Sequence, residues 1–280
     1  MSTSTKVIAF VAGLVVVFAA ALGIGKVVGG PSEPSESKQH GDHDMAGMAT
    51  PDYGLQSTES GYTLAGLSSP SAANAPGALT FTITGSDGKP VTAFDTEHDK
   101  QLHLIVVRSD TAQYRHVHPT MSADGIWSID WTWPTGGNYR VFADFEPTGG
   151  PGRLTLSSAV SVGGTFEHRP LPAPSRTFEV DGYTVTLEGD LTVAGGTLGF
   201  TVTRDGQPVT DLQPYLGANG HLVALRATDL AYLHVHPENA SSPGPTVQFH
   251  AEAPSAASYR LFFDFKHGDV VRTAEFTVTA

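Results

Sequence analysis

Short segments of alternating apolar and polar residues recur along the chain after position 60. Leu79, Phe81 and Ile83 alternate with threonines, which is the pattern of a β-strand with one buried face. Further β-branched and aromatic segments follow in LHLIVV, IWSIDWTW, YRVFADF and LTLSSAVSV. Asp-Gly pairs at 87–88 and 205–206 supply turn chemistry. Because no segment after position 26 keeps the period of a helix, the pattern predicts an all-β protein.

The chain also repeats itself. GSDGKPVT at 85–92 matches TRDGQPVT at 203–210, and AQYRHVHP at 112–119 matches LAYLHVHP at 230–237. The spacing between matched residues is nearly constant, and a short loop insertion accounts for its drift. The chain therefore contains two copies of one domain.

These copies occupy residues 61–164 and 178–280, and the proline-containing stretch 165–177 reads as a semi-rigid linker. Each copy has room for about seven short strands with turns between them, the number typical of an immunoglobulin domain. We therefore expect two tandem immunoglobulin-like β-sandwich domains.

The N-terminus carries one uninterrupted apolar run. Residues 7–25 contain no charged side chain and lie between Lys6 and Lys26. At about 1.5 Å per helical residue this run covers a hydrocarbon core of about 30 Å. We expect residues 1–26 to form a signal anchor or transmembrane helix in a single-pass protein of the cell membrane, with the C-terminal domains extracytoplasmic. The alternative is a cleaved secretory signal ending near Ala19–Ala21, which would make the protein secreted.

Residues 27–60 are rich in Gly, Pro, Ser and acidic residues, a composition typical of a flexible tether. Within it His40, His43, Met45 and Met48 lie close together. Thioethers favour Cu(I), so this segment is a weak candidate for copper capture, and chance composition of a solvated linker is the alternative.

The net charge and the absence of cysteine restrict the partners and the metal ligands that this chain can have. The formal net charge of −12 opposes contact with nucleic acid phosphates, so no nucleic acid partner is expected. The chain has no cysteine, which excludes disulfides, thiolate metal sites and thiol nucleophiles. Any bound metal must therefore be held mainly by nitrogen and oxygen.

Histidines supply the nitrogen. Residues two apart on a strand point to the same face, so each H-V-H-P element presents two neighbouring imidazoles. A third histidine and an aspartate recur in register in both copies. The first candidate site is His103, His116, His118 and Asp144, and the second is His221, His234, His236 and Asp264.

Three imidazoles and a carboxylate suit Cu(II) or Zn(II) better than magnesium or calcium. The alternative is that the histidines are hydrogen-bonded structural residues and that the aspartates form ion pairs with neighbouring arginines.

With its anchor, its His/Met-containing tether and its duplicated H-V-H-P strands, the chain resembles membrane-anchored extracytoplasmic β-sandwich proteins of actinobacterial type. More loosely it resembles the YtkA-like and CopC-like domains. That resemblance implies copper handling outside the cytoplasmic membrane. The chain departs from the CopC-like pattern because it lacks a histidine at the mature N-terminus.

These observations favour a non-enzymatic, extracytoplasmic metal-binding protein with copper, or alternatively zinc, as its ion and one site per sandwich. No hydrolase, phosphate-loop or zinc-protease motif is present in the sequence. The competing hypothesis is a cell-surface adhesion or scaffold protein with structural histidines. A copper oxidoreductase or zinc hydrolase has less support because no general base is identifiable. The sequence identifies no protein partner.

Overall fold

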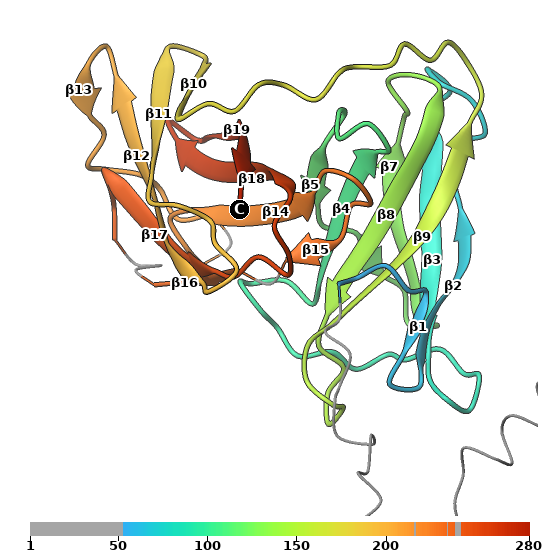
Figure 1. The fold of residues 1–280 in the computed structure, drawn as a ribbon. Coiled ribbons are helices and arrows are strands. Elements are labelled where there is room, and N and C mark those ends of the chain that lie inside the picture. Colours follow the sequence, from blue (N-terminus) through green and yellow to red (C-terminus); the bar gives the residue numbers. More distant parts are fainter. Residues whose placement is uncertain (1–52, 216, 234, 239–241) are drawn as a thin grey trace, which may run out of the picture. The chain divides into compact units, whose positions relative to one another are not determined.

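The computed structural model describes residues 53–280 apart from residues 216, 234 and 239–241. The predicted anchor and the His40–Met48 segment of the tether lie outside the described residues. Among the described residues, no helix is long and apolar enough to cross a membrane. The described chain is all-β and forms two tandem immunoglobulin-like β-sandwiches, which confirms the predicted fold class (Figure 1).

The first sandwich consists of two antiparallel sheets, with strand orders β1-β2-β3-β7-β6 and β5-β4-β8-β9. Its strands are β1 Thr58–Glu59, β2 Tyr62–Ser68, β3 Gly77–Thr84, β4 Leu102–Arg108, β5 Arg115–Val117, β6 Thr120–Met121, β7 Ile126–Trp131, β8 Gly137–Phe145 and β9 Leu154–Val162.

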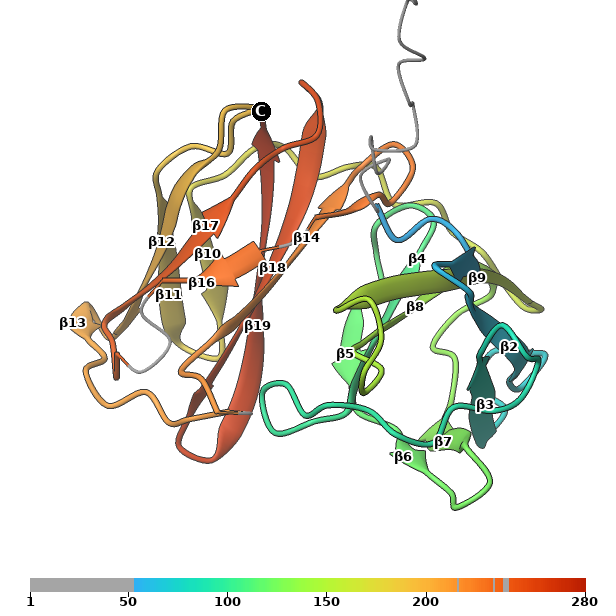
Figure 2. The same ribbon diagram turned by 90° about the horizontal axis from the view of Figure 1, so that it is seen from below.

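The second sandwich repeats this plan, with strand orders β10-β11-β12-β17-β16 and β15-β14-β18-β19 (Figure 2). Its strands are β10 Thr177–Val180, β11 Tyr183–Glu188, β12 Gly196–Arg204, β13 Gln207–Pro208, β14 His221–Arg226, β15 Tyr232–Leu233, β16 Val235–Pro237, β17 Thr246–Ala251, β18 Ser258–His267 and β19 Val270–Thr279. Asp205 and Gly206 turn the chain from β12 into β13 with φ values of 51° and 74°, a conformation that Asp-Gly pairs tolerate well.

Each sandwich has its own apolar core between its two sheets. In the first, the alternating residues Leu79, Phe81 and Ile83 of β3 pack against Leu104 and Val106 of β4 and their neighbours. The corresponding strands β12 and β14 build the core of the second sandwich. The period-two pattern therefore places one face of β3 inside its own sandwich.

Strand β4 departs from this one-sided pattern because all of its residues are buried. Leu104 and Val106 belong to the core of the first sandwich, whereas Ile105 and Val107 belong to a separate apolar cluster. That second cluster, called here the interface cluster, also contains residues of the second sandwich. Its buried members are Ile105, Val107, Phe142, Val223, Leu225, Leu230, Tyr232 and Phe262.

The interface cluster joins the outer faces of two sheets. Phe262 on β18 stacks on Tyr114 with ring centroids 3.9 Å apart and nearly parallel planes. Tyr232 of the second repeat packs against Phe142 of the first at 5.6 Å. Because these rings are removed from water only where the two sheets meet, the hydrophobic effect holds the two repeats face to face.

The packing predicts that Phe262→Ala will lower the free energy of unfolding by about 3–5 kcal/mol, since it deletes a fully buried ring from the interface cluster. Val271→Ala, at a side chain that is 38% exposed, should change stability by less than about 0.5 kcal/mol. Urea unfolding of the full-length chain measures both. Equal, small effects of the two substitutions would show that the interface does not contribute to stability.

Candidate metal centre

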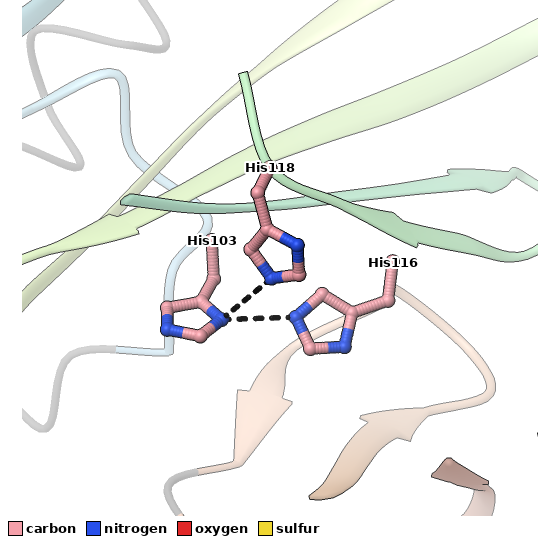
Figure 3. Close-up of side chains that lie close together, drawn as sticks. All are labelled: His103, His116 and His118. Atoms are coloured by element: carbon pink, nitrogen blue, oxygen red, sulfur yellow. Dashed lines mark hydrogen bonds between the residues drawn. The ribbon is translucent and has the colours of Figure 1, made fainter. Parts of the chain in front are cut away.

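Three histidines of the first repeat converge at the edge of the interface cluster. His103 lies on β4, His116 on the neighbouring β5, and His118 just beyond β5. Strand pairing sets Ile105 opposite His116, so the histidine of β5 lies beside the outer face of β4. One nitrogen from each ring lies within 4.8 Å of the other two. Figure 3 shows the rings turned toward one another, nitrogen to nitrogen.

The inner nitrogens are closely spaced. His103 Nδ1 lies 3.1 Å from His116 Nε2 and 3.1 Å from His118 Nε2. Nitrogens bound to one Zn²⁺ at about 2.0–2.1 Å would be separated by a similar distance. The two distances to His103 Nδ1 therefore suit ligands of a single ion, and the nitrogens of His116 and His118 lie within 4.8 Å of each other.

The outer nitrogens determine the tautomers. His103 Nε2 lies 3.1 Å from the carbonyl oxygen of Glu97, and His116 Nδ1 lies 2.9 Å from Asp264 Oδ2. Because both oxygens can only accept here, each outer nitrogen must carry the proton and donate it. The inner nitrogens of the two neutral rings then present lone pairs.

Two lone pairs facing each other at 3.1 Å repel unless a cation lies between them or a neighbouring N–H donates to one of them, and His118 Nε2 is also 3.1 Å from His103 Nδ1. That cation is a proton, which makes one ring an imidazolium, or a metal ion. Hydrogen bonds to the outer nitrogens are the usual way in which proteins orient metal-binding imidazoles. The arrangement thus has the chemistry of a nitrogen-donor metal centre.

Burial keeps the rings of His103, His118 and His221 neutral. Desolvation, with smaller contributions from neighbouring histidines, lowers the pKa of His103 to about 2. Desolvation likewise lowers the pKa of His118 to about 3, and that of His221 to about 4. Neutral rings are the form that binds metals, because only they have a free lone pair.

The second repeat contributes two of the predicted residues to the surroundings of this cluster. Asp264, which pairs with His221 across β14 and β18, hydrogen-bonds His116 of the first repeat. The His221 ring lies 6.0 Å from that of His116 and 4.9 Å from that of His98, and its Nε2 donates to Tyr215 at 2.7 Å. His221 therefore stands next to the converging nitrogens without joining them.

Asp144 lies opposite His103 in the strand register, and its contacts are with other groups. Arg153 Nε lies 3.3 Å from Asp144 Oδ1, and the hydroxyl of Thr155 donates to the same oxygen at 3.3 Å. A cavity of about 50 Å³ adjoins these groups and is also lined by His103 and His221. Asp144 therefore lies beside the histidine cluster as the ion-pair partner of Arg153.

The remaining candidates of the second repeat do not form a described cluster. His234 lies outside the described residues, as do His40, His43, Met45 and Met48. The backbone of His236 belongs to β16, where it pairs with His250.

Three contributors were not anticipated from the sequence, namely the Glu97 carbonyl, the His98 ring beside His103 and His221, and the pairing of Asp264 with the opposite repeat. A signal that the outer face of β4 meets another surface was available, although it does not identify Asp264, because residues 104–107 of β4 are apolar at successive positions instead of alternate ones. Such a run is typical of a strand buried on both faces, and it marks the outer face as a contact surface.

Fold and site together define a class of protein: two immunoglobulin-like sandwiches packed face to face, with a buried histidine cluster at their junction. Residues 57–161 and again 178–280 match the family described as "Domain of unknown function (DUF8832)", and the chain belongs to this family with two copies of its domain. Residues 4–55 match a family described as "Protein of unknown function (DUF2613)". No curated protein matches the chain.

Several solved structures are distantly similar. They include invasin, a bacterial integrin-binding protein (14% identity, TM-score 0.22, covering 78% of this chain and 39% of invasin). Another is the Escherichia coli adhesin FdeC, with 13% identity and a TM-score of 0.25 over 80% of this chain and 65% of FdeC. A third is InvD of Yersinia pseudotuberculosis, with 13% identity and a TM-score of 0.25 over 79% of this chain and 58% of InvD. The chain spans less than two thirds of each of these structures, and at such TM-scores no function carries over.

The lowered histidine pKa values predict acid sensitivity. The pKa of His103 falls from 6.5 to about 2 on folding, so below pH 6.5 the unfolded chain binds a proton that the folded chain does not. Stability is therefore highest above about pH 6.5 and falls toward lower pH, by up to about 1.4 kcal/mol per pH unit for each such histidine.

Urea unfolding of the metal-free chain between pH 7.5 and 5 measures this slope. His103→Asn should reduce the slope even though it also lowers stability. An unchanged slope in that variant would contradict a neutral, buried His103.

Proposed function

We propose that this protein binds a first-row transition metal ion outside the cytoplasm, in a centre formed by His103, His116 and His118. The observation that supports the proposal is the convergence of three imidazole nitrogens, with His103 Nδ1 3.1 Å from both His116 Nε2 and His118 Nε2. Both outer nitrogens are already hydrogen-bonded to oxygens. Outer hydrogen bonds to a carboxylate or a carbonyl are the ones that orient imidazoles in metal sites.

Copper is the ion proposed first, and zinc is the alternative. Three imidazole nitrogens without a thiolate suit Cu(II) and Zn(II), which are borderline ions, and are poorly suited to magnesium or calcium. The histidines and methionines of the tether favour copper because thioethers add affinity for Cu(I).

We propose that the centre holds its ion without catalysing a reaction. A metal-dependent hydrolase needs a general base close to the bound water. Both aspartates beside this cluster have partners, because Asp144 is paired with Arg153 and Thr155, and Asp264 accepts from His116 and Thr273. A carboxylate held in this way is a poor proton acceptor, which favours binding over turnover.

The location follows from the N-terminal prediction. If residues 7–25 span the membrane, the two sandwiches lie on the extracytoplasmic side. Cleavage of the segment would give a secreted form with the same centre.

An adhesion or scaffold role is the second candidate. The distantly similar solved structures include one named as an integrin-binding protein and one named as an adhesin. In that role the histidines would only join the repeats, and the protein would retain no metal.

The proposal predicts that the full-length chain retains about one Cu(II) or Zn(II) ion at the cluster after dialysis against micromolar metal. His116→Ala combined with His118→Ala should abolish this retention, because it removes two of the three ligands. His250→Ala is the matched control, since its ring is about half exposed and lies away from the cluster. Elemental analysis of bound metal measures all three proteins.

Failure of the wild-type chain to retain metal would overturn the proposal and favour the adhesion role. Equal retention by the double variant and the wild type would place the ion elsewhere, with the tether as the first candidate.

A further inference from the structure

The two repeats meet through equivalent surfaces. Ile105 of the first repeat corresponds to Val223 of the second in the repeat alignment, and Phe142 corresponds to Phe262. All four belong to the interface cluster. Each repeat therefore buries the same outer sheet face, and the two equivalent faces pack against each other.

The aromatic contacts exchange partners across this interface. Tyr114 stacks on Phe262 of the other repeat, and its counterpart Tyr232 packs on Phe142. Each repeat thus completes the outer face of the other, which is the geometry of a two-fold, self-complementary contact.

A polar residue of the second repeat likewise contacts the first repeat across this interface. Asp264 lies on β18 two positions after Phe262, and its side chain is 3% exposed. One carboxylate oxygen accepts from Thr273 of its own repeat at 2.5 Å, and the other accepts from His116 of the first repeat at 2.9 Å. The carboxylate is therefore fixed by Thr273 of its own sandwich and points toward His116 of the other sandwich.

We propose that the second repeat is the positioning half of the metal centre and that Asp264 is its positioning residue. This inference rests on the proposed metal binding. By accepting the Nδ1 proton of His116, Asp264 keeps the lone pair on Nε2, where the ion binds. When the repeats separate, His116 loses this acceptor and is free to take the other tautomer, in which Nε2 carries the proton and cannot bind metal.

Metal binding and docking of the repeats are then linked. The ion binds more tightly to the docked form, in which His116 is oriented. Reciprocity requires that the bound ion strengthen docking by the same factor. This linkage gives the domain duplication a function. The first repeat alone would contain the three histidines but not Asp264, the carboxylate that orients His116.

The first test is Asp264→Asn in the full-length chain, with Glu275→Gln as the matched control. Glu275 lies on the adjacent strand β19 opposite Phe262, and the partner of its carboxylate is Arg260 and not a histidine. Loss of an orienting carboxylate should weaken Cu(II) or Zn(II) binding by about 10–100-fold, and the control should bind like the wild type. Electron paramagnetic resonance of bound Cu(II) should change in Asp264→Asn alone, which a general loss of stability would not produce.

The second test separates the repeats without disturbing their cores. Val223 faces the interface cluster and not the core of its own sandwich. Val223→Lys should undock the repeats because a buried ammonium group is costly, and metal affinity should fall as it does for Asp264→Asn.

The two levels of the proposal fail in different ways. If the wild type retains metal and His116→Ala/His118→Ala does not, while Asp264→Asn binds as tightly as Glu275→Gln, the positioning role is overturned and metal binding stands. If Val223→Lys binds as tightly as the wild type, the linkage to docking is overturned. If the wild type retains no metal, both the function and this inference are overturned.

Discussion

The burial of two outer sheet faces against each other is the constraint on which the rest of the structure depends. In an isolated immunoglobulin-like sandwich the outer face of β4 would be exposed to water, and polar residues would be expected there. Here that face carries Ile105 and Val107, both fully buried against the second repeat. Exposing them would cost hydrophobic free energy on both repeats at once, so the two sandwiches pack together as one compact unit from residue 50 to residue 280.

This packing creates the environment of the histidine cluster. His103 shares its face of β4 with Ile105 and Val107, so docking removes the imidazole from water along with its apolar neighbours. The desolvation that lowers its pKa is a consequence of the same contact. A buried, neutral imidazole with a fixed outer hydrogen bond is what the proposed metal centre requires, and an exposed histidine on a free strand would not provide it.

Much of the fold could be predicted from the sequence, and less of the site. The alternation of Leu79, Phe81 and Ile83 indicates a strand with one buried face, and matched segments indicate two similar domains. The spacing of H-V-H-P indicates that His116 and His118 share a face, because strand periodicity is a local property.

The role of Asp264 could not be predicted in this way. Its partner depends on how two folded domains dock, and the register of β14 and β18 only places it beside His221 of its own repeat. The repeat alignment suggested two separate centres, whereas in the structure Asp264 is directed at His116 of the opposite repeat. The contact of His103 with the carbonyl of Glu97 could not be predicted either, because every residue has a backbone oxygen and the residue type does not show which one is used.

The most direct measurement of the central claim is nitrogen-15 NMR of the histidine side chains, recorded before and after addition of one equivalent of Zn(II). In the metal-free protein above pH 7 we expect His103 to carry its proton on Nε2 and His116 on Nδ1, as their oxygen partners require. Zinc should then shift His103 Nδ1, His116 Nε2 and His118 Nε2 together. The opposite tautomers, or zinc-induced shifts confined to other histidines, would contradict the account.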